Sequence, residues 1–196
     1  MDSSTVDWNQ KWRERAAEEL VPDPWLQRVL PLLPAGRALD LGCGRGRNAL
    51  YLAERGYAVT ALDASAEGLA LLQQQAGKRG LPISLRRQDL EAEPLLPLSA
   101  FELVTVFFYL QRSLFPAIKA ALVPGGVAVV RTFSAAGDFP GGPRRREFIL
   151  HPGELLEMFA GWEILLHEEG VEASRKGGAL AGIVARKPFG EAAPCV

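Results

Sequence analysis

The chain has 196 residues, of which 48% are hydrophobic and 23% charged, so the composition is that of one well-buried globular domain over residues 1–196. A formal net charge of −1 gives no basic surface for nucleic acid, and the longest apolar runs, such as 103–110, are too short to span a bilayer. Two cysteines, Cys43 and Cys195, make no disulfide framework or zinc cluster, so we expect a reducing, cytoplasmic setting, no membrane association and no metal.

The first predicted elements are helical. Residues 6–20 are expected to form one helix, because Trp8, Trp12, Ala16 and Leu20 recur every four residues and share a face. A short second helix is expected over residues 25–33, bounded by prolines on both sides.

From residue 35 onward, strands and helices alternate. The predicted strands are 37–41, 58–63, 83–87, 102–108, 127–133, 163–167 and 180–186. The predicted helices between them are 45–55, 67–78, 113–122 and 152–159. This pattern predicts an α/β, Rossmann-like, seven-stranded, mostly parallel sheet with helices on both faces. The last two strands have only a polar loop between them, which predicts an antiparallel C-terminal strand. We therefore expect a helical cap over about 1–34, a core over 35–188 and a tail over 189–196.

The most informative motif is the glycine turn after the first strand. Gly42, Gly44 and Gly46 follow Asp40, and a helical pattern begins directly after them. Glycines allow the backbone to approach a ligand closely, and the exposed N–H groups favour negative charge. A second acid, Asp63, closes the next strand. This order of strand, glycine turn, helix, strand and acid is typical of a mononucleotide-binding half of a Rossmann-like sheet. It predicts a ligand outside the carboxyl ends of the strands.

The spacing of the turn distinguishes between two cofactor classes. A dinucleotide fingerprint requires Gly-x-Gly-x-x-Gly, whereas here Gly46 comes one residue early and Arg47 takes the last glycine position. Asp40 would repel a pyrophosphate and suits a cationic ligand such as S-adenosylmethionine, which carries an ammonium and a sulfonium. A nicotinamide-dependent oxidoreductase is the alternative that this argument disfavours.

Several motifs in order resemble the class I S-adenosylmethionine-dependent methyltransferases. They are Asp40–Gly46, Ala61–Asp63, Gln88–Leu90 and Leu122–Gly126. The chain is more similar still to the tellurite-resistance (TehB-like) branch, on the evidence of Gly46–Ala53, Gly56–Ala61, Gly161–Glu163 and Ala185–Pro188. The resemblance covers about residues 7 to 188 and implies an enzyme that transfers a methyl group to a small molecule.

The resemblance also implies roles for individual residues in cofactor binding. Gly42, Cys43 and Gly44 would line the methionine part, with Asp40 near its ammonium. Asp63 would accept hydrogen bonds from the ribose hydroxyls, Asp89 would bind the adenine amino group, and Leu90 would pack on the ring. Val106 and Phe107 would face the sulfur and methyl. Asn48, Ala64 and Trp8 complete the expected cofactor-binding set. Trp8 and its neighbour Trp12 are interpreted either as core anchors or as a cover over the cofactor.

The catalytic residues stay unassigned at this point. Tyr109, His151 and Arg175 are candidates, and no residue is committed as a base, which favours a soft or already ionised acceptor such as a thiol or chalcogen compound. Members of the TehB-like branch carry a His-Arg pair before the last strand, whereas this chain has Glu172–Lys176 without a histidine. Loop 134–146, with its Arg144–Arg146 run, is a candidate substrate lid. A monomer or homodimer is expected. A non-catalytic S-adenosylmethionine-binding sensor or partner protein is the second alternative.

Overall fold

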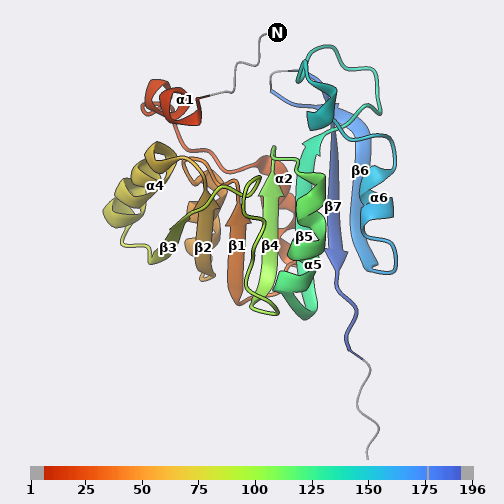
Figure 1. The fold of residues 1–196 in the computed structure, drawn as a ribbon, viewed down its shortest axis with the longest axis horizontal. Coiled ribbons are helices and arrows are strands. Elements are labelled where there is room, and N and C mark those ends of the chain that lie inside the picture. Colours follow the sequence, from red (N-terminus) through yellow and green to blue (C-terminus); the bar gives the residue numbers. More distant parts are fainter. Residues whose placement is uncertain (1–6, 176, 191–196) are drawn as a thin grey trace, which may run out of the picture.

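The computed structural model describes residues 7–175 and 177–190 of the chain. Its centre is a seven-stranded sheet in the order β3-β2-β1-β4-β5-β7-β6 (Figure 1). The strands are β1 (Arg37–Leu41), β2 (Ala58–Asp63), β3 (Ile83–Arg87), β4 (Phe101–Phe107), β5 (Leu122–Phe133), β6 (Glu163–Ala173) and β7 (Ala179–Arg186). The α-helices are α1 (Trp8–Glu14), α2 (Pro24–Val29), α3 (Arg47–Ala53), α4 (Ala66–Arg79), α5 (Phe115–Ala121) and α6 (Glu154–Met158). Short 3₁₀ helices are η1 (Leu30–Leu32), η2 (Arg112–Leu114) and η3 (Arg146–Phe148).

The predicted sheet is confirmed. Strands β1 to β5 pair in parallel, and β7 lies antiparallel between β5 and β6. The connections from β1 lead outward through β2 to β3, and the chain then returns to place β4 on the other side of β1. The boundary between β1 and β4 is therefore the topological switch point, where open α/β sheets bind their ligands.

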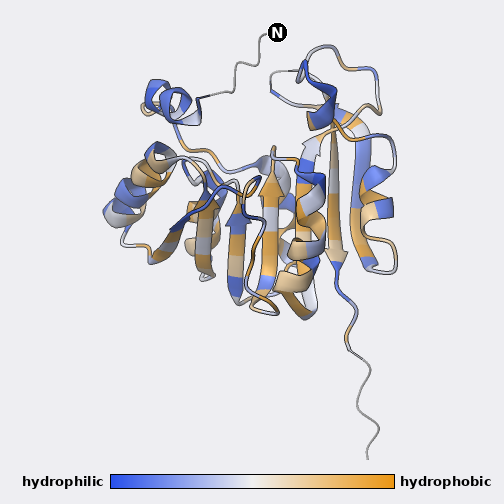
Figure 2. Ribbon diagram, viewed as in Figure 1, coloured by the Kyte–Doolittle hydropathy of each residue, from blue (hydrophilic) through white to orange (hydrophobic). Residues whose placement is uncertain are grey.

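Two hydrophobic clusters cover the two faces of the sheet. One joins α2, α3 and α4 to the strands through residues such as Trp25, Leu50 and Leu72. The other joins α5 and α6 through Phe115, Ile118 and Phe159. Hydrophobic residues run along the central strands, whereas α1 is largely hydrophilic (Figure 2) and contributes no buried residue. Helix α1 is thus placed outside the core and lies above α4, at the end of the sheet where the parallel strands finish (Figure 1).

The first helix is shorter than predicted. Helix α1 begins at Trp8 and ends at Glu14, whereas the expected helix ran from Val6, which lies outside the described residues, to Leu20. The reason is a competing interaction from elsewhere in the fold. The guanidinium of Arg45 donates to the carbonyl oxygens of Ala16 (3.4 Å) and Glu18 (3.1 Å), so this segment is held as an open turn. The helix predicted over 25–33 is likewise split, into α2 and η1.

Strand β6 is longer than predicted, because its second half was interpreted as a polar loop. The strand continues from His167 to Ala173 with β7 as its partner. Its glutamates find distant partners: Glu168 accepts a hydrogen bond from the Trp25 indole (2.7 Å) and Glu169 accepts one from the Ser134 hydroxyl (2.7 Å). Paired acids are compatible with a strand, and only the tertiary structure supplies these pairs. Of the predicted tail over 189–196, only Phe189 and Gly190 are described.

Candidate functional site

The glycine turn joins β1 to α3 and lies at the switch point. Gly42, Gly44 and Gly46 have φ values of +63°, +55° and +77°, in the left-handed region that glycine adopts without strain. A Cβ atom at Gly46 would lie 2.2 Å from Cδ1 of Leu72. The turn therefore requires glycine at this position both for its backbone conformation and for its close packing on α4.

Asp63, at the end of β2, is tied to this turn. One carboxylate oxygen accepts the Gly44 N–H at 2.7 Å, and the other accepts the Ser65 N–H at 2.8 Å. Burial raises the pKa of Asp63, while the backbone N–H groups act in the opposite direction. Each carboxylate oxygen accepts more than one hydrogen bond, so Asp63 retains capacity for two hydroxyl donors.

Asp40 lies beneath the turn rather than on its surface. Its side chain is 2% exposed, and the Thr105 hydroxyl on β4 donates to it at 2.7 Å. Burial raises the pKa of Asp40 to about 7, opposed by this hydrogen bond and by the charge of Arg47. A nearby cation stabilises the charged form of a buried carboxyl whose pKa is raised.

Trp12 covers the outer side of the turn. A Cβ atom at Gly44 would lie 2.7 Å from Cζ2 of Trp12, and one at Gly68 would lie 3.0 Å from its Cδ1. The indole Nε1 of Trp12 is buried without a hydrogen-bond partner among the described residues. Trp8 stacks on Trp12 at 5.7 Å between centroids and is 46% exposed. Trp12, rather than Trp8, is thus the tryptophan that contacts the glycine turn.

Tyr109 lies on the inner side of the turn. A Cβ atom at Gly42 would be 3.1 Å from Cβ and Cγ of Tyr109. Burial, together with the charges of Glu91, Asp89 and Asp63, raises the pKa of Tyr109 well above its usual range. The phenol is therefore protonated at neutral pH and can donate a hydrogen bond but cannot act as a base.

The residues after β3 lie at the same end of the sheet as the glycine turn. Asp89 is exposed and accepts the Glu91 N–H at 2.9 Å. Leu90 is buried at 4% exposure within the cluster that also holds Leu41 and Leu62. The structure thus brings Asp89 and Leu90 to the carboxyl end of the sheet near Tyr109.

The end of β4 carries three aromatic residues in a row. Val106 and Phe107 are buried on opposite faces of the sheet. Phe108 follows with a φ of +56°, which is uncommon for a residue with a large side chain. Its ring lies between the Arg47 guanidinium, 5.5 Å from the ring centroid, and Phe133, whose ring centroid is also 5.5 Å away. Such strained backbone is frequent at functional sites.

A buried charged network next to Phe108 was missed by the sequence analysis. Asp23 is 4% exposed and binds Arg47 at 3.1 Å and Arg131 at 3.4 Å. Arg131, itself buried, also binds Glu172 and lies 5.3 Å from the Trp25 ring centroid. The available signals were a single arginine inside the apolar run of β5 and an aspartate between two prolines. These signals do not identify the partners.

The remaining predicted site residues have varied surroundings. Asn48 is buried and its side chain accepts the Asp23 N–H at 3.0 Å, so it holds the chain before α2. The carbonyl of Ala64 accepts from Arg87 at 3.3 Å. Burial raises the pKa of the Cys43 thiol well above its usual range, which keeps the thiol protonated.

The structure separates two of the catalytic candidates. Arg175 is exposed. Burial lowers the pKa of Arg47, and the charge of Arg175 adds a smaller contribution in the same direction, so the two side chains lie near each other. His151 is exposed at the turn before α6, and its backbone N–H donates to Glu154 at 2.8 Å, which pairs with Arg112. His151 is therefore next to the Glu154–Arg112 pair, and none of its described contacts involves the glycine turn. His167 lies in β6 with Nε2 buried and unpartnered within the described part of the chain.

The residues at the switch point fit an adenosyl sulfonium cofactor. The fit depends on the hydrogen-bonding capacity of Asp63, the buried acid Asp40 beneath the turn, and the unpartnered Trp12 indole. No three His, Cys, Asp or Glu side chains in residues 7–175 and 177–190 are grouped to hold a metal ion. Over the same residues, no helix has the length and apolar character of a membrane span.

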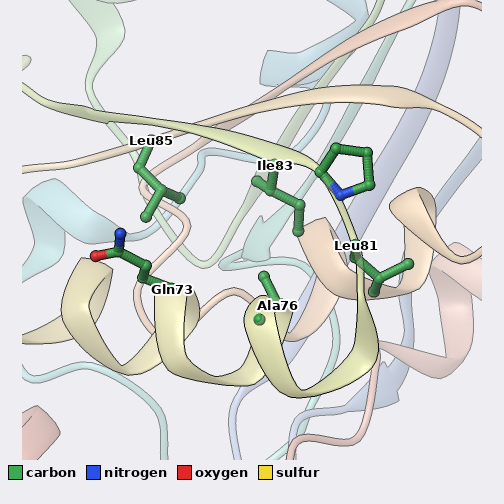
Figure 3. A pocket seen from close by; sticks show the side chains of 7 residues that line it. Gln73, Ala76, Leu81, Ile83 and Leu85 are labelled. Atoms are coloured by element: carbon green, nitrogen blue, oxygen red, sulfur yellow. The ribbon is translucent and has the colours of Figure 1, made fainter.

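A larger cavity lies elsewhere. It measures about 490 Å³ and opens between α4 and β3, at the edge of the sheet (Figure 3). Gln73 is its polar side chain, and its other lining residues, among them Leu81 and Ile83, are apolar or glycine. Because it contains no titratable side chain, it offers no group for catalysis.

Comparisons with known proteins agree with this geometry. A sequence of Haemophilus influenzae described as "Probable S-adenosyl-L-methionine-dependent methyltransferase TehB" is 34% identical over 138 residues, which is 68% of this chain and 48% of that protein. "Hemagglutinin 1" of Eikenella corrodens is 34% identical over 140 residues, which is 69% of this chain and 46% of that protein. The chain thus spans about half the length of these curated relatives. The crystal structure of TehB from Haemophilus influenzae superposes with a TM-score of 0.75 at 24% identity, covering 92% of this chain and 67% of that one. The family profile "Tellurite resistance protein TehB" matches residues 26–181, so the chain belongs to the TehB family.

Proposed function

We propose that the chain binds S-adenosylmethionine at the switch point and transfers its methyl group to a small-molecule acceptor that carries a thiolate or another ionised chalcogen. The observation that carries the proposal is the arrangement of Asp63 and Asp40 around one glycine turn. Asp63 offers two oxygens to hydroxyl donors, and Asp40 offers a buried carboxyl whose raised pKa a nearby cation would lower, which favours its ionised form. Asp40 would repel a pyrophosphate, whereas the ribose hydroxyls that Asp63 would accept occur in both cofactor classes, so Asp40 is the group that distinguishes between them. Membership of the TehB family supports the same assignment.

In this proposal different residues around the glycine turn bind different parts of the cofactor. Asp63 accepts the ribose hydroxyls, and Asp89 with Leu90 receives the adenine. Gly42, Cys43 and Gly44 present backbone to the methionine part. The orphaned indole N–H of Trp12 is available to an oxygen of the ligand, which accounts for a polar atom that would otherwise be buried at a cost of about 1–3 kcal/mol.

Aromatic side chains lie at the end of β4, beside the proposed cofactor site. When bound, S-adenosylmethionine supplies a methyl carbon on a cationic sulfur, whose bonding electron pair stays on the departing thioether. Phe107 is 8% exposed, and Phe108 is held over Arg47. These rings exclude water from the end of β4, which strengthens electrostatic interactions there, and they restrict the direction from which an acceptor approaches.

The acceptor class follows from the lack of a base in this neighbourhood. Tyr109 stays protonated because its pKa is raised, and the described contact of His151 is with Glu154. An acceptor that arrives already ionised needs no base, and Arg47 with Arg175 provides positive charge to attract it. A thiolate or another reduced chalcogen meets this requirement at neutral pH, whereas an ammonium does not.

Product analysis tests the proposal. The purified chain is incubated with S-adenosylmethionine and separately with small thiols, selenide, telluride and small amines, and S-adenosylhomocysteine and methylated products are measured by mass spectrometry. We expect turnover of thiols or chalcogen compounds, with a rate that rises with pH through the acceptor's own pKa. Turnover of amines alone would contradict the acceptor class. Firm cofactor binding without any turnover would indicate a sensor or partner protein.

A further inference from the structure

The guanidinium of Arg47 is only partly used by the protein. Arg47 is the first residue of α3, directly after the glycine turn. Its Nη2 donates to Asp23 at 3.1 Å, and the side chain forms no other hydrogen bond within residues 7–175 and 177–190. A guanidinium carries five N–H donors, and the Arg47 side chain is 35% exposed. Its Nε and Nη1 atoms therefore remain available to a ligand.

Positive charge is in excess around Arg47. Its partner Asp23 is shared, because it also binds Arg131 at 3.4 Å. Arg131 has a second partner in Glu172, whose side chain is 46% exposed. Burial lowers the pKa of Arg47, and the nearby charge of Arg175 acts in the same direction. Arg175 is exposed and forms no ion pair in the part of the chain that the structure describes. Three guanidinium groups thus share two carboxylates.

Asp40 does not remove this excess. Burial raises its pKa to about 7, so the carboxyl is only partly ionised at neutral pH. In the proposed function, the ionised form of Asp40 balances the positive charge of the cofactor. The positive charge of Arg47 and Arg175 thus remains for the acceptor.

Arg47 lies where the acceptor would approach in the proposed function. Leu41, the last residue of β1, is paired with Val106 of β4, so the glycine turn and Phe108 leave the sheet next to each other. The Phe108 N–H donates to the Arg131 carbonyl at 2.8 Å, and the Phe108 ring centroid lies 5.5 Å from the Arg47 guanidinium. A guanidinium that stacks on a ring keeps its N–H donors at its edge. Phe108 thus holds Arg47 beside the end of β4.

The chemistry of methyl transfer decides which part of the acceptor these arginines bind. An attacking thiolate loses its negative charge as its bond to the methyl carbon forms, while the bond from that carbon to the cofactor's sulfur breaks and the electron pair stays on that sulfur. A guanidinium on the attacking atom would stabilise the ground state more than the transition state and slow the reaction. A second anionic group keeps its charge throughout, so binding it orients the thiolate without this disadvantage.

We propose that Arg47 and Arg175 bind a carboxylate of the methyl acceptor, which is therefore a small mercaptocarboxylate with its thiolate directed toward the cofactor. The inference rests on the proposed function and narrows its acceptor class. Arginine suits this role because its N–H donors match the oxygens of a carboxylate. A bare chalcogenide, in contrast, carries its charge on the attacking atom and has no second group for the two arginines.

The test compares two acceptors that differ in one group. Methyl transfer to mercaptoacetate and to mercaptoacetamide, its uncharged analogue of similar shape, is measured for the wild type, Arg47→Gln and Arg175→Gln. Arg175 is exposed, so its variant keeps the test valid if Arg47→Gln does not fold. Arg79→Gln is the matched control, because Arg79 is exposed in the last turn of α4, where it pairs with Glu54 at the opposite end of the sheet. Titration with S-adenosylhomocysteine checks folding and cofactor binding.

The measured quantity is the kcat/KM for mercaptoacetate divided by that for mercaptoacetamide. We expect this ratio to fall about tenfold in Arg47→Gln, because hydrogen bonds to a charged group are lost. In Arg175→Gln it should fall about threefold, since exposed charge pairs contribute less. It should stay at the wild-type value in Arg79→Gln.

The outcomes separate this inference from the proposed function. One ratio shared by all four proteins would overturn the inference and leave the proposed function standing. No turnover of either compound would also overturn the inference, whereas the proposed function would stand if other thiols are methylated. Failure of the wild type to bind S-adenosylhomocysteine would overturn the proposed function, and the inference with it.

Discussion

The carboxylate of Asp63 accepts the backbone N–H of Gly44 at 2.7 Å. This hydrogen bond joins the end of β2 to the turn after β1, so the acid and the glycine turn form one rigid unit at the switch point. The unit presents backbone on one side and an acceptor for hydroxyl groups on the other.

Asp63→Asn is predicted to weaken S-adenosylhomocysteine binding by about 10–100-fold, because hydrogen bonds to a charged group contribute about 1.5–3 kcal/mol. The amide keeps one oxygen for a backbone N–H but loses the charge and half of the accepting capacity. Isothermal titration measures the change, and Glu157→Gln on the exposed side of α6 is the matched control. Equal affinities for all three proteins would show that Asp63 does not contact the ligand.

Asp40→Asn is predicted to stabilise the ligand-free protein at pH 8. Burial raises the pKa of Asp40 from 3.8 to about 7, so the folded state holds a proton that the unfolded state has already lost. The stability associated with that proton is complete below about pH 4 and is lost as the pH rises to about 7. One pKa unit corresponds to about 1.4 kcal/mol, so the variant should exceed the wild type by more than about 1 kcal/mol at pH 8.

Urea unfolding at pH 5 and pH 8 measures this difference for the Asp40 variant. Asparagine can still accept the Thr105 hydroxyl, so the comparison isolates the charge. Asp138→Asn, at an exposed position, should show no such pH-dependent gain. Unfolding free energies of wild type and Asp40→Asn that stay parallel between the two pH values would refute the raised pKa.

Gly46→Ala is predicted to destabilise the fold much more than Gly56→Ala. Both residues have positive φ, +77° and +85°, so both substitutions incur the left-handed backbone strain of about 1–2 kcal/mol. Only at Gly46 does the added Cβ atom meet a neighbour, at 2.2 Å from Leu72, whereas nothing lies within 4 Å at Gly56. Overpacking adds about 1–3 kcal/mol, measurable by chemical denaturation. Equal losses in the two variants would mean that the turn does not pack on α4 as described.

Arg131→Met is predicted to lower the free energy of unfolding by about 3–5 kcal/mol. The substitution removes one partner of a buried ion pair, so the negative charge of Asp23 is balanced less completely. Combining it with Asp23→Asn should cost less than the sum of the two single variants, since the uncompensated charge is then absent. Chemical denaturation of the four proteins gives the coupling energy. Additive effects would contradict a direct Asp23–Arg131 interaction.

The sequence was sufficient to locate the first three strands. The bounds predicted for them, 37–41, 58–63 and 83–87, coincide with β1, β2 and β3, because each is a short run that glycine, proline or an acid terminates. The antiparallel position of β7 followed from the missing helix before it. The glycine turn, Asp40 and Asp63 were placed together correctly at the carboxyl end of the sheet, and their binding roles stay predictions.

The elements that the sequence did not reveal depend on partners distant in the chain. Helix α1 ends early because the Arg45 guanidinium donates hydrogen bonds to carbonyl oxygens of the turn that follows it. Strand β6 extends because its glutamates have hydrogen-bond donors in other elements. Glu168 accepts from the Trp25 indole, and Glu169 accepts from the Ser134 hydroxyl. Local patterns contain no information on such pairs, and the same reason explains why the Asp23–Arg131 network was missed.

The central claim is that the site beside Gly44 and Asp63 binds an adenosyl sulfonium compound and not a dinucleotide. Isothermal titration of the full chain with S-adenosylhomocysteine and, separately, with NADH tests it most directly. The account predicts saturable one-to-one binding of S-adenosylhomocysteine and no heat of binding with NADH. Tight binding of NADH without binding of S-adenosylhomocysteine would contradict it.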